Sequence, residues 1–391
     1  MALTFRLAQE VDVWSLMALY QRVGSTYTED AIFLDYQKLL LAVNSLDNIW
    51  VIAERDGVIT TTISLMIDRE QCLAKIARII VNPQLSSVRS DLKDTIRYCI
   101  KFLEESSSKI HVLYCTTMTV PMQFQEVTLE EGFKILGIFP NAMGVDYTRL
   151  NGLTAYYFGN TLAEDRVSGF ALHPELRPFF EISRSQLNLP DLPVANISAL
   201  SNDNQADSIG MLEVVNAPNL VAAKFEKLRR RRRQMNDFYP FYKPNIMISS
   251  PDEDIQLFAK VIESNHFAAF VGEELLVAVN PAKLYQTAVQ LLKAQNITYF
   301  EIINDAADTV GNQWLLEASF VPCCYIPAFK KQNEKRRDYV VFCKTFEYIT
   351  RPDLKIRKPF LDFFREFFSM EWKNYVGTGE LFSKSHYETK K

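Results

Sequence analysis

Several features that are typical of other classes of protein are scarce or missing in this chain of 391 residues. There are only 13 glycines and 16 prolines, which excludes collagen-like and low-complexity architectures. With four histidines and six cysteines, none of them in a Cys-x-x-Cys pair, the sequence predicts no metal site. No stretch approaches the ~20 apolar residues of a membrane-spanning helix, and the first residues lack the pattern of a signal peptide. We therefore expect a cytoplasmic protein without a metal.

The composition that remains is that of folded domains. Hydrophobic residues make up 48% of the chain, and the length corresponds to two or three domains of about 150 residues each. The adjacent Cys323 and Cys324 suit neither zinc ligation nor a local disulfide, so we interpret the cysteines as buried free thiols in a reducing compartment. The net charge of −4 gives no overall field that attracts polyanions.

The first 150 residues predict alternating helices and strands, with a hairpin turn at Arg55-Asp56-Gly57. In chain order they are strand 3–6, helices 12–21 and 36–45, strands 48–54, 60–68 and 73–82, helix 91–105, strand 109–115, helix 122–131 and strand 133–139. This order predicts an α+β fold: a mixed, mostly antiparallel sheet with helices on both faces, rather than a doubly wound parallel sheet.

Landmarks of the first part return later in the chain. They are Val-Asn-Pro at 81–83 and 279–281, each expected to end a strand and precede a helix, a strand at 110–115 and 297–303, an apolar segment ending in proline at 131–140 and 318–327, and Asp-Tyr at 146–147 and 338–339. Four landmarks in the same order favour a tandem duplication over two unrelated domains. We expect domains at 1–150 and 246–350, a connecting part of the second domain at 151–245 with the boundary near 147–159, and a C-terminal helix and tail at 351–391.

These landmarks resemble the GNAT superfamily of N-acyltransferases. In that family a strand ends in a hydrophobic-x-Pro step, a glycine-rich loop and a helix follow, and a later helix ends in Gly-Phe before the last strands. Here Ile79–Pro83, the helix at 91–105, the strand at 109–115 and Glu131–Phe133 follow that order. The resemblance implies two tandem GNAT-like domains and an acyl-CoA as co-substrate.

The resemblance also implies where the acyl-CoA binds. In the family the fourth strand diverges from the fifth, the pantetheine arm adds there like a strand, and the pyrophosphate binds at the N-terminus of the next helix. The matching positions are Ile80, Val81, Ser86, Ser87, Val88, Arg89 and Ser90. The loop contains no glycine, and Asp91 places a carboxylate near the anion, although it also suits a helix N-cap. In the second copy Pro281 enters its helix with no loop long enough for a pyrophosphate, which favours the first copy.

Acyl transfer to an amine needs a base, N–H donors for the thioester carbonyl and an acid for the leaving thiolate. The tyrosine that the family often places four residues before the Gly-Phe glycine is replaced by Thr128, and by Leu315 in the second copy. The available substitutes are Asp68, Glu70, His111, Tyr114 and Cys115. Of these we choose Glu70 as base and Tyr114 as acid, while a histidine such as His111 is more often structural.

Two further segments stand out. Arg229–Arg233, followed by aromatic residues, suits an anionic ligand or partner, a nucleic acid, or a solvated helix end with a negative dipole. The near-neutral chain and the absence of a nucleic-acid motif argue against nucleic acid.

A stripe at helical spacing is formed by Phe360, Phe363, Phe364, Phe367 and Phe368. It predicts a helix that docks on the protein's own body, on a partner or second copy, or at a membrane surface.

Two hypotheses follow from these observations. The first is an N-acyltransferase that moves an acyl group from acyl-CoA to a small amine. The second is a catalytically inactive GNAT-like scaffold that binds a protein partner through its aromatic C-terminal helix or the segment Arg229–Arg233. The missing loop glycines and the missing tyrosines favour the second hypothesis, and the repeated strand and helix order favours the first.

Overall fold

The structure is a computed structural model of the whole chain. It describes residues 2–23, 31–85, 88–106, 109–118, 123–142, 150–197, 209–231, 235–237, 239–347 and 356–378. The expected α+β fold is confirmed: a mixed, mostly antiparallel sheet is covered by helices.

The chain forms two compact units. The first consists of Met1–Ile135, Gly152–Arg166 and Ala328–Arg336, and the second of Leu136–Asn151, Val167–Pro327 and Arg337–Lys391. A strand at Leu150–Tyr157 lies where the sequence suggests a domain boundary, and most of it belongs to the first unit. The four domain ranges drawn from the sequence stay a prediction.

The elements of the first unit are those that the sequence predicts, with ends shifted by a few residues and two differences. They are β1 (Thr4–Leu7), α1 (Val13–Val23), α2 (Tyr36–Val43), β2 (Asn48–Arg55), β3 (Val58–Asp68), β4 (Leu73–Val81), α3 (Val88–Glu105), β5 (Val112–Met118), α4 (Gln123–Glu130) and β7 (Leu150–Tyr157). The strand β7 was not predicted, and the predicted strand 133–139 is β6 (Lys134–Pro140), most of which belongs to the second unit. The strands lie in the order β1-β2-β3-β4-β5-β7. Asp56 and Gly57, with φ of 52° and 76°, make the predicted tight turn between β2 and β3.

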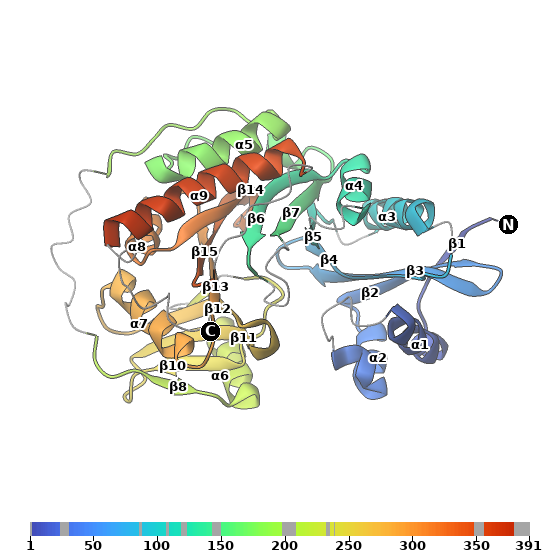
Figure 1. Cartoon of the computed structure of the whole chain (residues 1–391), viewed down its shortest axis with the longest axis horizontal. Coiled ribbons are helices and arrows are strands. Elements are labelled where there is room, and N and C mark those ends of the chain that lie inside the picture. The colour runs from blue at the N-terminus through green and yellow to red at the C-terminus, as the bar shows by residue number, and fades with distance from the viewer. Residues whose placement is uncertain are drawn as a thin grey trace, which may run out of the picture. The chain divides into compact units, whose positions relative to one another are not determined.

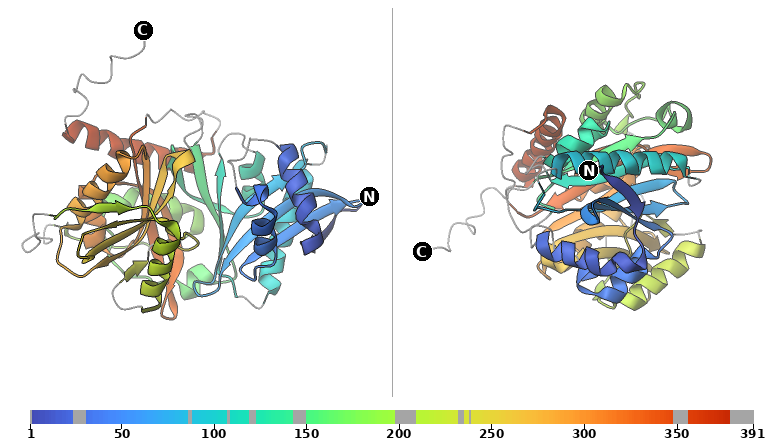
Figure 2. Two further views of the ribbon diagram at one scale, coloured as in Figure 1. Left: turned by 90° about the horizontal axis from the view of Figure 1, so that it is seen from below. Right: turned by 90° about the vertical axis from the view of Figure 1, so that its right-hand side faces the viewer.

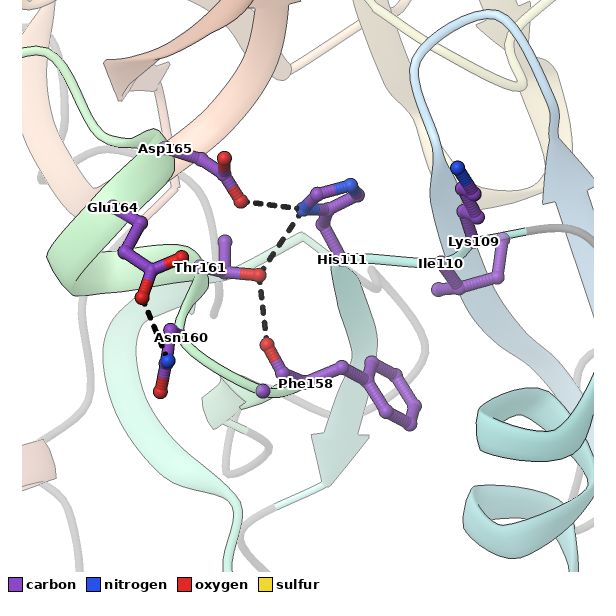
Figure 3. Close-up of a pocket in the computed structure, with 9 residues that line it drawn as sticks. Lys109, Ile110, His111, Phe158, Asn160, Thr161, Glu164 and Asp165 are labelled. Atoms are coloured by element: carbon purple, nitrogen blue, oxygen red, sulfur yellow. Dashed lines mark hydrogen bonds and ion pairs between the residues drawn. The ribbon is translucent and has the colours of Figure 1, made fainter.

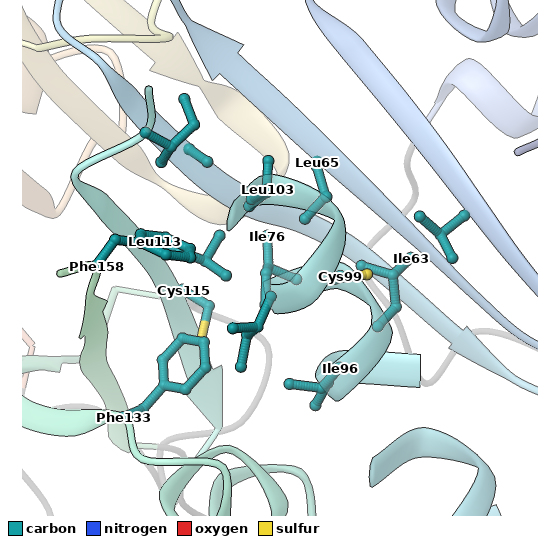
Figure 4. Close-up of a cluster of buried hydrophobic side chains, with 14 of the residues drawn as sticks. Ile63, Leu65, Ile76, Ile96, Cys99, Leu103, Leu113, Cys115, Phe133 and Phe158 are labelled. Atoms are coloured by element: carbon teal, nitrogen blue, oxygen red, sulfur yellow. The ribbon is translucent and has the colours of Figure 1, made fainter. Parts of the chain in front are cut away.

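Helices cover both faces of this sheet (Figures 1 and 2). On one face α1 and α2 pack against Trp50, Ile52 and Ile80. On the other face α3 lays its apolar side on the sheet (Figure 4). Its residues Ile96 and Cys99 are fully buried, and each large aliphatic side chain buried in this way contributes roughly 1.5–3 kcal/mol. The amphipathic spacing of α3 therefore holds it against β3, β4 and β5.

The second unit is built from a similar series of elements. They are β6 (Lys134–Pro140, its first two residues in the first unit), α5 (Arg177–Leu187), β8 (Glu213–Val215), α6 (Pro218–Arg231), β9 (Met235–Asp237), β10 (Ile246–Ser249), β11 (Ile255–Ile262), β12 (Phe267–Leu275), α7 (Pro281–Lys293), β13 (Tyr299–Asp305), α8 (Thr309–Glu317), β14 (Val321–Gln332, with residues 328–332 in the first unit), β15 (Lys335–Thr345, its first two residues in the first unit) and α9 (Lys358–Thr378). Its strands run β8-β10-β11-β12-β13-β15-β14-β6, and β9 pairs with β12 off this path.

The two units share a feature of topology. In each, an antiparallel series ends in one parallel pair, β4–β5 or β12–β13, and a helix, α3 or α7, connects the two strands of the pair. This common order is what a tandem duplication would produce, and the duplication remains a hypothesis. The second Val-Asn-Pro does not end a strand as expected, because β12 already stops at Leu275; Asn280 instead caps α7 by accepting from the Lys283 backbone N–H.

The aromatic stripe of the C-terminal helix is covered by the chain itself. Phe360, Phe363 and Phe367 of α9 are fully buried and Phe364 is 8% exposed, while Phe368 is 45% exposed. Phe363 packs on Phe179 of α5. Four of these five side chains therefore dock on the protein's own body. Docking on a partner stays a prediction, and among the five only Phe368 is exposed enough to contact one.

Other predicted features are placed as follows. All six cysteines are free thiols; Cys72 is half-buried and the rest are buried. Arg229, Arg230 and Arg231 form the last turn of α6, where they suit the negative end of the helix dipole, and Arg232 and Arg233 lie outside the described residues. Among the helices that the structure describes, none is long and apolar enough to cross a bilayer. Within the same residues no group of three or more metal-ligating side chains comes together.

Candidate functional site

The central feature of the first unit is that β4 and β5 pair along only part of their length. The parallel ladder joins Leu73 with Val112 and continues to Ile76 with Cys115. Beyond this last pair β4 continues through residues 77–81 and β5 through 116–118 without pairing to one another. We call these unpaired stretches the β4–β5 opening.

A β-bulge explains why the strands part. On β3 the neighbours Ser64 and Leu65 pair with Arg78 and Ile76, so Ala77 is an extra residue without a partner. A bulge bends its strand and increases the local twist. The extra residue also shifts the side-chain alternation, because Ile76 and Ile79, three positions apart, both pack on the cluster under α3. The bulge therefore turns the second half of β4 away from β5.

The N-terminus of α3 follows β4 at this edge of the sheet. The helix begins at Val88, so Asp91 lies inside the first turn and is not the N-cap that the sequence suggests. Its carboxylate is 1% exposed and lies 2.7 Å from the Arg55 guanidinium. The repulsive charge expected at the anion site is thus compensated by Arg55. The positive end of the helix dipole remains available to an anion.

Arg89, the residue expected to contact phosphate, is engaged with acids on α4. Its guanidinium lies 2.9 Å from Glu126 and 2.5 Å from Glu130. Arg97 forms a similar bond with Glu131 further along α3, at 2.8 Å. These ion pairs join α3 to α4 and to the residue that follows it, and the Arg89 pairs are worth little because solvent screens them. A phosphate can therefore compete for Arg89 at small cost.

The remaining positions predicted to bind the cofactor differ in burial and in the side of the sheet that they face. Ile80 is 3% exposed and packs toward α1 and α2, and Val81 packs toward α3, so both can offer a ligand only their backbone groups. Val88 is half-buried and Ser90 is exposed in the first turn of α3. Ser86 and Ser87 lie outside the described residues.

Tyr114 lies beside the opening. It pairs with Lys75 one position before the last pair of the ladder, and its ring packs on Phe329 with the Lys75 ammonium 5.9 Å from its centre. The next residue, Cys115, faces the α3 side, 3.1 Å from the Thr154 hydroxyl. Burial raises the pKa of Cys115 to about 12, so this thiol stays protonated at neutral pH and is a poor nucleophile.

The other proposed acid–base residues lie at the opposite end of the strands. Glu70 is exposed in the turn between β3 and β4, and Asp68 fixes that turn by accepting from the Gln71 backbone N–H at 2.8 Å. His111 directly precedes β5. The structure therefore does not bring Glu70 together with Tyr114 at the opening, since the whole paired part of β4 separates Glu70 from it. The sequence could not show this, because the direction of the divergence depends on strand pairing.

His111 belongs to a separate pocket of about 290 Å³ (Figure 3). Its Nδ1 lies 3.1 Å from both the Thr161 hydroxyl and an Asp165 carboxylate oxygen. Burial lowers the pKa of His111, the Arg336 cation lowers it further, and Asp165 opposes both effects. Thr161 and Asp165 contact the same ring nitrogen, so this group is not a nucleophile–histidine–acid relay.

Two polar residues were missed in the sequence, one on β5 and one on α4. Thr116 is exposed and is the first residue of β5 past the last pair. Gln125 of α4 is fully buried, and neither its amide nitrogen nor its amide oxygen has a hydrogen-bond partner among the described residues. Such an orphaned amide costs stability unless a ligand satisfies it. No sequence pattern marks either residue; Thr128, in the family's tyrosine position, is buried and bonds to the Gln125 carbonyl.

No family model matches the chain, and no curated protein matches it. Among solved structures, it is similar to an acetyltransferase of the GNAT family from Streptococcus pneumoniae, with 17% identity and a TM-score of 0.35 over 40% of this chain and 100% of the other. The ribosomal-protein-S18-alanine N-acetyltransferase from Escherichia coli matches with 12% identity and a TM-score of 0.34, over 40% and 95%. A PaiA N-acetyltransferase from Thermoplasma acidophilum in complex with coenzyme A matches with 15% identity and a TM-score of 0.32, over 40% and 100%. The likeness is one of fold alone.

Proposed function

We propose that the first unit is an N-acyltransferase that moves an acyl group from acyl-CoA to a small amine. The observation that supports this most directly is the β4–β5 opening, where the ladder stops at Ile76 and Cys115 although both strands continue. Free strand edges accept an extended chain. The pantetheine arm of CoA is such a chain, because it is narrow and carries amides that can hydrogen-bond to the backbone.

In this proposal α3 receives the pyrophosphate. The first-turn N–H groups and the helix dipole favour an anion, Arg55 compensates the Asp91 charge, and Arg89 exchanges a carboxylate for a phosphate oxygen. We assign to the Gln125 amide a hydrogen bond with an amide of the donor. That bond would satisfy a group that is otherwise buried without a partner.

The chemistry needs little from the side chains. The amine nitrogen forms a bond with the thioester carbon, backbone N–H groups of residues 77–81 stabilise the resulting oxyanion, and collapse breaks the carbon–sulfur bond. One proton leaves the amine nitrogen to water, and one reaches the departing sulfur. We assign the second transfer to Tyr114, which lies next to the last pair of the ladder, and we assign no role to Glu70 because of its place at the far end of β4.

Calorimetric titration of the whole chain tests the proposal. Acetyl-CoA and longer acyl-CoAs should bind, and Arg89→Gln should weaken acetyl-CoA binding about tenfold while leaving the binding of S-acetylpantetheine, which lacks the pyrophosphate, unchanged. Arg97→Gln loses a comparable contact, between α3 and the residue just after α4, and should alter neither ligand. An absence of heat with every acyl-CoA would reject the transferase.

A further inference from the structure

The second unit contains an opening of the same construction. Its parallel ladder joins Phe267–Ala269 of β12 to Tyr299–Glu301 of β13 and then stops, although β12 runs on to Leu275 and β13 to Asp305. A register shift between Phe258 and Ala259 of β11 again leaves one residue of β12, Val271, as the extra residue of a bulge. Residues 270–275 and 302–305 do not pair with one another, and we call them the β12–β13 opening.

This second opening is filled by the chain itself. The strand β9, Met235–Asp237, pairs antiparallel with Gly272–Glu274 of β12. The opposite edge of Gly272–Glu274 is already paired with Gln256–Phe258 of β11. Since a strand has two edges, β9 must lie on the edge that faces β13. In the first unit no strand of the described residues pairs with the corresponding edge of β4 beyond Ile76.

The segment after β9 is anchored where the opening begins. The Tyr239 hydroxyl donates to Oε2 of Glu301 at 3.1 Å, and Glu301, 4% exposed, belongs to the last pair of the β12–β13 ladder. The Tyr242 ring lies 5.1 Å from that of Tyr239 and 6.4 Å from Phe267, which is in the first pair. The segment therefore crosses the paired part of both strands and directs β9 into the gap beyond it.

We infer that β9 takes the place in the second unit that an extended acyl donor takes in the first, and that it excludes acyl-CoA from the second unit. This rests on the proposed function of the first unit. A strand tethered in the same chain competes at a high effective concentration, and it pairs with the edge of Gly272–Glu274 that β13 does not reach. The chain then binds one acyl-CoA, in the β4–β5 opening, and the second unit is closed by its own sequence.

Hydrogen exchange of the full chain, read by mass spectrometry, tests the position of β9 without any ligand. The amides of Met235–Asp237 and Gly272–Glu274 should be protected in the free protein. Tyr239→Phe removes the anchoring hydroxyl and should speed their exchange on the order of tenfold. Tyr36→Phe, a tyrosine of α2 in the first unit, is the matched control and should leave these amides unchanged.

Titration with acetyl-CoA completes the test. One equivalent should bind, with new protection in residues 77–81 and 116–118 and none in 270–275. Exchange of Met235–Asp237 at the rate of an unstructured chain, two equivalents bound by the wild type, or protection of 270–275 by acetyl-CoA would each overturn the inference. If no acyl-CoA binds at all, the proposed function fails, while protection of β9 in the free protein would still support its place in the second opening.

Discussion

Removal of the bulge residue Ala77 is the sharpest perturbation of the proposed site. Arg78 and Ile76 already pair with consecutive residues of β3, Ser64 and Leu65. Deleting Ala77 therefore leaves the β3–β4 register intact on both sides and converts the bulge into a regular ladder. The alternation of side chains also becomes regular, so Ile76 and Ile79 keep the face that they already occupy. The deletion variant should fold with β4 straightened against β5.

The expected changes in stability and in donor affinity follow from the length of the β4–β5 opening. Residues 116–118 of β5 have no partner on β4, and pairing them would form about two or three ladder hydrogen bonds at about 1 kcal/mol each. The free energy of unfolding should therefore stay level or rise by up to ~2–3 kcal/mol. A donor would have to break the same bonds to enter, so its affinity should fall by about 100-fold, from the conversion of 1.4 kcal/mol per tenfold change.

Urea unfolding and titration with acetyl-CoA measure the two effects on the same samples. The matched control is deletion of Val271, the corresponding bulge residue of β12. Because β9 fills that opening, the control should leave acetyl-CoA affinity unchanged, although loss of a buried valine will lower its stability. A folded Ala77 deletion variant that binds acetyl-CoA as tightly as the wild type would refute the assignment of the site.

Three further predictions address single residues. Tyr114→Phe should lower kcat for acyl transfer by about 100-fold with little change in the KM for acetyl-CoA; an unchanged kcat would remove Tyr114 as the acid. Gln125→Met should raise the free energy of unfolding by about 1–2 kcal/mol, because it replaces a buried amide without partners, while weakening acetyl-CoA binding; a loss of stability would show that the amide is satisfied. Because burial and the Arg336 cation lower the pKa of His111 below its ordinary 6.5, its contribution to stability is complete above pH 6.5 and is lost as the pH falls through the lowered value. Urea unfolding between pH 7.5 and 5 should show this slope, and His111→Gln should flatten it.

Patterns of residues that are close in sequence predicted most helices and strands of the first unit. The apolar spacing of α3 and the Asp56-Gly57 turn depend on residues that are close in sequence, so they could be recognised without the fold. Where a short-range rule was applied at an element end, it was less accurate: Asp91 suits an N-cap, yet α3 begins at Val88 and Asp91 instead pairs with Arg55, 36 residues away. Element ends depend on such distant partners.

The site depended still more on contacts between distant residues. Nothing in the sequence marks Ala77 as a bulge residue, because a bulge exists only relative to the register of β3. For the same reason Glu70 was chosen although it lies at the closed end of β4. The short strand β9 has no periodic pattern over its three residues, and its place on β12 follows only from the edge that the bulge leaves unpaired.

The sequence by itself thus determined the helices of the first unit and its strands except β7, since these depend on periods of two and 3.6 residues along one segment. Tertiary structure alone decided where β4 leaves β5, which charges compensate one another at α3, and which of the two openings is empty of strands among the described residues. The physical reason is that backbone groups take their partners from strands far apart in the chain, and one extra residue on one strand changes which of those partners can be reached.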